Sequence, residues 1–80
     1  MNINNIIALE EVLVDLKIAE NFYEKQNKGL GTYFKDTIIS DIESLWLYAG
    51  IHNKFFGLYR LLSKRFPYGI YYEINDDTVI

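Results

Sequence analysis

One run near the end of the chain is typical of a β-hairpin and strongly limits the folds open to this sequence. Residues 65–74 read Arg-Phe-Pro-Tyr-Gly-Ile-Tyr-Tyr-Glu-Ile and are rich in aromatic and β-branched residues, which are favoured in strands. The Asn-Asp-Asp sequence at 75–77 then predicts a turn. A further apolar run begins at residue 78 and ends at residue 80. The sequence therefore predicts a sheet whose last strand is short.

Length and composition predict a single small domain over residues 1–80. The chain has 80 residues, of which 50% are hydrophobic and 16% aromatic, so it is too apolar to be a disordered chain. No apolar run approaches the ~20 residues that a membrane span needs, and the N-terminus lacks a signal-peptide pattern. The absence of cysteine excludes a disulfide or a thiolate metal site. We expect a cytoplasmic protein without a membrane contact.

Two amphipathic helical patterns fill the first part of the chain. In the first, from Glu10 to Gln26, apolar residues recur at spacings of three or four, as in a helix with one buried face. The second runs from Thr32 to Tyr48. Between them, Gly29-Leu30-Gly31 predicts a helix stop and a tight elbow. Helices joined by so short a link should form an antiparallel hairpin.

Short strands are predicted around this helical hairpin. Residues 3–8 fit either a strand or the approach to a helix, because so short a run has no clear period. Residues 51–56 are predicted to be a connector, and two strands follow, Leu58 to Ser63 and Tyr68 to Ile74. In the second strand, alternation predicts one face that packs on the helices, formed by Tyr68, Ile70, Tyr72 and Ile74. The predicted fold class is α+β: an N-terminal short strand and an antiparallel helical hairpin packed on a small antiparallel sheet.

Four groups of residues, taken in order, resemble a known protein family. They are Asp15, Ala19 and Phe22-Tyr23-Glu24; Gly29-Leu30-Gly31 with Phe34; Tyr59-Arg60; and Lys64-Arg65-Phe66-Pro67-Tyr68 with Ile70-Tyr71-Tyr72. The ordered set is similar to the RelE/ParE superfamily of toxins from bacterial type II toxin–antitoxin systems, in the branch called plasmid stabilisation proteins. The resemblance covers nearly the whole chain.

The resemblance implies a small α+β toxin fold and a cognate antitoxin that wraps it. RelE-like members cut messenger RNA in the ribosomal A site, whereas ParE-like members inhibit DNA gyrase by binding. Where RelE-like nucleases commonly carry an arginine after the tyrosine that matches Tyr68, this chain has Gly69, and Leu62 replaces a second basic residue. These departures favour a ParE-like toxin that acts by protein binding. The alternatives are a RelE-type messenger-RNA endonuclease on the ribosome, or a non-toxic relic that only oligomerises or binds antitoxin.

The resemblance and the charges select five residues for partner or target binding: Arg60, Lys64, Arg65, Tyr68 and Tyr71. The three cations form the only notable basic cluster, which reads either as a partner contact or as a solvated hairpin edge. Tyrosines are enriched at protein interfaces, but they also stack bases in RNA-binding sheets or fill a sheet core. A net charge of −3 argues against general nucleic-acid affinity.

No catalytic residue, metal site or cofactor is predicted. His52 is the single histidine, and no neighbouring nucleophile or carboxylate implicates it as a general base. The acidic residues have the spacing of helix polar faces, and Asp76-Asp77 that of a hairpin turn.

The short run at residues 78–80 leaves the preceding strand exposed as a sheet edge. Exposed edges pair with other chains unless they are protected. We therefore expect a homo-oligomer, or an antitoxin strand that completes the sheet.

Overall fold

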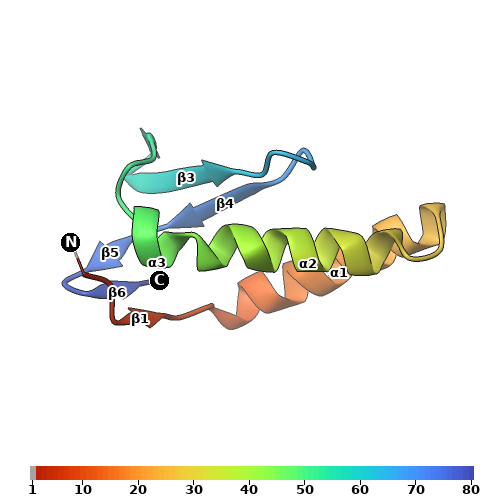
Figure 1. Ribbon diagram of the computed structural model, residues 1–80, viewed down its shortest axis with the longest axis horizontal. Coiled ribbons are helices and arrows are strands. Elements are labelled where there is room, and N and C mark those ends of the chain that lie inside the picture. The colour runs from red at the N-terminus through yellow and green to blue at the C-terminus, as the bar shows by residue number, and fades with distance from the viewer. Residues whose placement is uncertain (1) are drawn as a thin grey trace.

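The computed structural model describes residues 2–80 and shows an α+β chain, as predicted (Figure 1). Its helices are α1 (Glu10–Gln26), α2 (Leu30–Glu43) and α3 (Leu45–Tyr48), and its strands are β1 (Asn5–Ile6), β2 (Lys54–Phe55), β3 (Leu58–Leu62), β4 (Gly69–Tyr72), β5 (Ile74–Asn75) and β6 (Thr78–Val79). Within this part of the chain, no helix has the length and apolar character needed to cross a membrane.

Helices α1 and α2 form the predicted hairpin and lie side by side along the long axis of the molecule (Figure 1). Their close approach depends on Gly31, where an added Cβ would lie 2.6 Å from the carbonyl oxygen of Glu20. The Glu24 carboxylate accepts hydrogen bonds from the backbone N–H groups of Gly29 and Gly31, both at 3.0 Å. Helix α1 has the predicted bounds, with Asn27 as its C-cap. Gly29 adopts a left-handed φ of 86° and serves as the N-cap of α2.

The second predicted helix begins slightly earlier than expected and is interrupted at Ser44. Residues 45–48 form the separate short helix α3. The Ser44 hydroxyl donates a hydrogen bond to the Asp41 carbonyl, and serine side chains that bond the preceding turn compete with the helical ladder. This local competition explains the break, which the apolar periodicity did not reveal.

The predicted antiparallel sheet is corrected in two respects. There are two three-stranded sheets, in the orders β2-β3-β4 and β1-β6-β5, and β1 pairs with β6 in parallel. The predicted connector at 51–56 contains β2, and Glu73 interrupts the predicted strand 68–74 between β4 and β5. The parallel pair is fastened by Asn4, whose Nδ2 donates to Asp77 Oδ2 at 2.6 Å.

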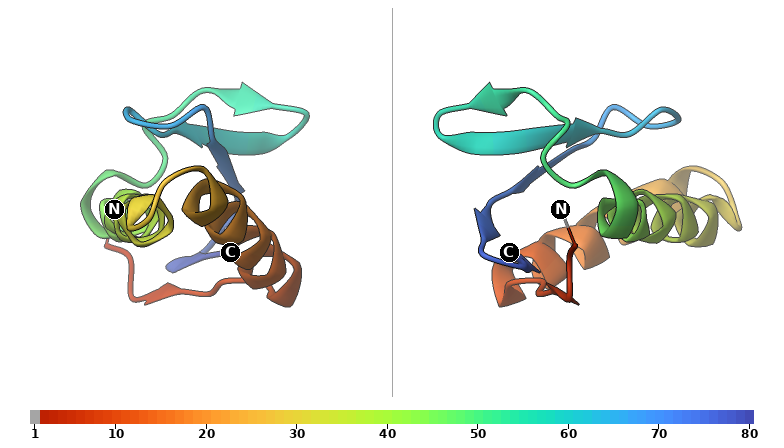
Figure 2. Two further views of the ribbon diagram at one scale, coloured as in Figure 1. Left: turned by 90° about the vertical axis from the view of Figure 1, so that its right-hand side faces the viewer. Right: turned by 60° about the vertical axis from the view of Figure 1, so that its left-hand side comes forward.

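The core lies between the helices and the inner faces of the two sheets. Its buried large side chains are Phe34, Ile38, Leu45, Tyr72 and Val79. The predicted inward face of residues 68–74 is confirmed, because Tyr72 is buried and Ile70 is half-buried while Tyr71 is exposed. Figure 2 shows the β2–β3 hairpin lying above the helices, with its other face turned outward.

Candidate protein-interaction surface

The outward face of the β2-β3-β4 sheet carries a row of apolar side chains around one arginine. The pairs Phe55↔Leu58, Arg60↔Tyr71 and Leu62↔Gly69 are directly opposite each other, and residues two apart on a strand share a face. We call this set the outer face: Phe55, Leu58, Arg60, Leu62 and Tyr71. Its four apolar members are between 36% and 57% exposed, so the face has no cover within residues 2–80.

Arg60 lies at the centre of the outer face and is held by an aromatic ring. Its guanidinium carbon is 3.8 Å from the centroid of the Phe55 ring, a distance typical of a cation–π contact. Its Nε is shielded from solvent and has no hydrogen-bond partner. The ion pairs among residues 2–80 involve other cations. Arg60 is therefore oriented by Phe55 and has no carboxylate partner among residues 2–80.

The tip of the β2–β3 hairpin adds a fully exposed phenylalanine. Phe56 and Gly57 connect the paired residues Phe55 and Leu58, with φ values of 55° and 83°, as in the type I′ turns that favour asparagine-glycine. Phe56 is the bulky residue at the first of these positions, and its side chain is 102% exposed. A strained and fully exposed aromatic residue is more readily explained by contact with a partner than by folding.

The charges of the chain are separated between its two halves. Residues 44–72 contain four of the eight Lys and Arg residues and none of the eleven Asp and Glu residues. This segment, which includes β2, β3 and β4, carries a charge of +4, while the rest of the chain carries −7. The outer face is consequently suited to an apolar partner with acidic groups.

The structure does not bring the five predicted binding residues together. Arg60 and Tyr71 are neighbours on the outer face. Lys64 and Arg65 lie in the turn after β3, beside a groove of about 400 Å³ next to α2, and Nη1 of Arg65 donates to the Tyr33 hydroxyl at 2.7 Å. Tyr68 packs inward against Phe34, with ring centroids 5.3 Å apart. Burial, aided by the negative charge of Asp15, raises the pKa of Tyr68.

His52 packs against a buried tyrosine of β4. Its Nδ1 is hydrogen-bonded to the hydroxyl of the buried Tyr72, which also accepts the N–H of Gly50 at 3.0 Å. Burial lowers the pKa of His52, and mainly burial raises the pKa of Tyr72. Within residues 2–80, no group of three His, Cys, Asp or Glu side chains is arranged to hold a metal ion.

The five binding residues selected from the sequence did not include Phe55, Phe56, Leu58 or Leu62. The signal was the pair Phe56-Gly57 between two short apolar runs, which has the length of a two-residue hairpin loop. Asparagine or aspartate is the expected residue before that glycine, so the phenylalanine hid the turn.

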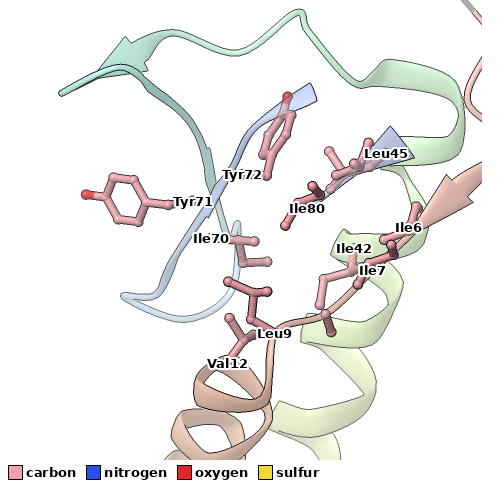
Figure 3. A pocket seen from close by; sticks show the side chains of 12 residues that line it. Ile6, Ile7, Leu9, Val12, Ile42, Leu45, Ile70, Tyr71, Tyr72 and Ile80 are labelled. Atoms are coloured by element: carbon pink, nitrogen blue, oxygen red, sulfur yellow. The ribbon is translucent and has the colours of Figure 1, made fainter. Parts of the chain in front are cut away.

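A second opening lies beside β4, where Figure 3 shows apolar side chains converging from several elements. This cavity of about 70 Å³ is bordered by residues 6–9 on one side and by residues 70–72 on the other. Val12, Ile42, Leu45 and Ile80 also line it. Its lining is almost entirely hydrocarbon, so it is suited to an apolar side chain.

The chain was compared with protein-family models, with curated proteins and with solved structures, and none of them matches it.

Proposed function

We propose that this chain is the toxin component of a type II toxin–antitoxin system, of the ParE-like kind, and that it acts by binding protein rather than by catalysis. A cognate antitoxin neutralises it, and DNA gyrase is the candidate target. The observation that supports binding is the outer face, where a central arginine without an acidic partner is surrounded by exposed apolar side chains. The proposed superfamily rests on the ordered residue groups described above.

The arrangement around Arg60 argues against the messenger-RNA endonuclease alternative. Cleavage of RNA without a metal needs a general base, a general acid and cationic stabilisation of the developing charge. The side chains paired with or stacked on Arg60 are Tyr71 and Phe55. The single histidine is bonded to Tyr72 on the inner side of the sheet. Within residues 2–80, the outer face therefore offers the cationic component and the Tyr71 phenol, but no histidine or carboxylate to complete an acid–base pair.

Induced expression of the chain in bacteria tests this proposal. We expect growth arrest with a DNA-damage response, and rescue when the adjacent small gene is co-expressed. Arg60→Gln should abolish the arrest, whereas Lys25→Gln, on an exposed part of α1, should leave it intact. Ribosome-dependent message cleavage would favour the endonuclease, and unchanged growth with folded, soluble protein would favour the relic.

Self-association is part of the same proposal. Seventeen large apolar side chains are exposed in residues 2–80, against five that are buried. Single exposed apolar residues are normal, but contiguous patches mark interaction sites. The homo-oligomer and the antitoxin complex are therefore competing states for the same exposed surfaces.

A further inference from the structure

One position on the outward side of the β2-β3-β4 sheet has no side chain, and a hollow opens there. Gly69 of β4 lies directly opposite Leu62 of β3. The hollow has a volume of about 350 Å³, and none of residues 72–80 borders it. Its lining comes from β3, from β4 and from the turn between them, and includes Arg60, Leu62, Phe66, Pro67, Gly69 and Tyr71. We call it the Gly69 hollow.

The fold itself does not require glycine at this position. The φ of Gly69 lies outside the left-handed region. An added Cβ would lie 3.6 Å from Leu62 Cδ2 and 3.7 Å from Cγ and Cδ of Arg60, which are ordinary contact distances. Glycine within a strand weakens it and often marks a place where a ligand or another chain approaches closely. The missing side chain is therefore better explained by an occupant of the hollow than by folding.

The turn that forms one wall of the hollow is held in place from inside. The N–H of Ser63 donates to the carbonyl of Tyr68 at 2.9 Å, and the N–H of Tyr68 donates to the carbonyl of Phe66 at 2.8 Å. The Phe66 ring packs edge-on against the buried Phe34, with ring centroids 5.0 Å apart. The hollow is thus formed before anything binds, and a preformed site loses little conformational freedom on binding.

The lining is suited to an apolar group that lies next to a negative charge. Leu62, Pro67 and Tyr71 are exposed and supply most of the hydrocarbon. Arg60 adds its methylene groups beside Gly69, and its guanidinium has no carboxylate partner among residues 2–80. The segment 44–72 contains no Asp or Glu, whereas the net charge of −3 for the whole chain disfavours a nucleic acid as the occupant.

From these observations we infer that the Gly69 hollow binds an aromatic side chain of a partner protein, and that an acidic residue beside this side chain pairs with Arg60. Aromatic side chains bury the largest contact area and are typical anchors in interface pockets. Arginine binds carboxylates through paired N–H donors. The inference names the chemistry of the partner, and it rests on the proposal that the outer face binds protein, not on toxicity.

Binding of 3-phenylpropionate tests the hollow, because this small probe joins a phenyl ring to a carboxylate. The amide chemical shifts of isotope-labelled protein show by NMR where the probe binds. We expect the amides of Leu62, Gly69 and Tyr71 to shift, with a Kd of about 1–10 millimolar for so small a molecule. The neutral analogue 3-phenylpropionamide should bind about fivefold more weakly, because it lacks the charge that pairs with Arg60.

Filling the hollow should prevent binding without harming the fold. Threonine is a good strand former, so Gly69→Thr should unfold at a temperature ~2–8 °C higher. Its side chain should weaken binding of the probe at least about tenfold. Gly69→Ala adds only the Cβ, whose contacts are ordinary, and should weaken binding about threefold. The control is Ile51→Thr, which removes an exposed apolar side chain outside the hollow and should leave binding unchanged.

Three results would overturn the inference. The first is no shift at Gly69 at probe concentrations well above the expected Kd, and the second is equal binding by Gly69→Ala, Gly69→Thr and the native chain. The third is tighter binding of a uridine oligonucleotide at the same amides, which would assign the hollow to single-stranded nucleic acid.

A second copy of the chain is also distinguished by this experiment. Shifts at Gly69 that grow with protein concentration without the probe, and that disappear in Phe56→Asn, would assign the hollow to the exposed Phe56 of another copy and overturn the inference. The growth experiment tests toxicity separately, so the toxin proposal can fail while the hollow binds the probe, and the hollow can fail while growth arrest is observed.

Discussion

Phe56 adopts a backbone conformation that costs the chain stability. A bulky residue at φ 55° brings Cβ close to the following carbonyl oxygen, and left-handed φ costs roughly 1–2 kcal/mol for most residues. Asparagine tolerates this region and is preferred in the same turn. Phe56→Asn should therefore raise the free energy of unfolding by about 1 kcal/mol. Thermal unfolding followed by circular dichroism should show a midpoint ~4–8 °C higher.

Phe22→Asn is the matched control for this substitution. Phe22 is also exposed, at 58%, but it lies within α1, where asparagine is a poorer helix former. It should lower stability slightly. Loss of partner binding in the stabilised Phe56→Asn protein would identify the hairpin tip as an interaction site that is maintained at the expense of stability. No gain in stability would contradict the strain argument.

His52 makes stability depend on pH in a predictable direction. Its pKa is lowered in the folded protein because burial disfavours the imidazolium, so the unfolded chain binds the proton more readily. The contribution of neutral His52 to the free energy of unfolding is complete above the ordinary histidine pKa of about 6.5. This contribution is lost as the pH falls below that value. Urea unfolding should show stability falling from about pH 7 to 5. In His52→Gln this part of the pH dependence should be absent, and its persistence there would assign the effect to other groups.

The contact between α1 and α2 depends on the absence of a side chain at one position. Alanine is normally the better helix former by about 1 kcal/mol. At Gly31, however, its Cβ would lie 2.6 Å from the Glu20 carbonyl oxygen and 2.9 Å from Glu24 Cβ. Gly31→Ala should therefore destabilise the fold by ~1–3 kcal/mol. Denaturant unfolding measures this change through the midpoint at an unchanged slope.

The control for the helix hairpin is Gly29→Ala, where an added Cβ has no neighbour within 4 Å and the cost comes only from φ 86°. Glu24→Gln tests the second part of this junction. It replaces the carboxylate that accepts the N–H groups of Gly29 and Gly31 with a neutral amide. The two hydrogen bonds should become weaker, because a charged acceptor forms a stronger hydrogen bond. Equal stability of Gly31→Ala and the native chain would show that the helices can separate without cost.

The sequence predicted the elements with a strong period and missed those set by local polar contacts. The two helices and the inward face of β4 follow from apolar spacing, which a buried surface enforces. The break at Ser44 depends on one hydrogen bond of the Ser44 hydroxyl. The interruption at Glu73 does not change the alternation of inward and outward residues, so the sequence pattern does not reveal it. Strand β2 has only two residues, and its turn carries phenylalanine in place of asparagine. The parallel pairing of β1 with β6 joins residues 73 positions apart, beyond the reach of any local pattern.

The candidate site was only partly predictable, because the strand period places some of its residues and not others. Arg60 and Tyr71 were selected from the sequence, and their cross-strand pairing places them together on the outer face. Tyr68 was selected with them, although alternation places residue 68 on the inner face. Lys64 and Arg65 follow β3 in a turn. There the two-residue alternation of a strand no longer determines which way a side chain points.

At the scale of the whole molecule, separation of charge gives the surfaces opposite character. The acid-free segment 44–72 includes the outer face, while α1 presents the exposed apolar residues Val14, Ile18 and Phe22 beside Glu11 and Asp15 on the acidic part of the chain. An apolar row with cations and an apolar row with carboxylates are complementary. Two copies are therefore expected to associate through these unlike surfaces.

This complementarity predicts self-association that salt weakens. In sedimentation at low salt, the average mass should rise above 9.4 kDa as the protein concentration increases through the micromolar range. Raising the salt to about 1 M shortens the screening length to ~3 Å, so the average mass should fall. Ile18→Lys should also lower it, because the change places a cation against the cationic outer face. Lys28→Gln, in the turn after α1, should have little effect. Association strengthened by salt would indicate a purely apolar contact. A constant mass of 9.4 kDa would contradict self-association and would leave the exposed surfaces for binding a different protein.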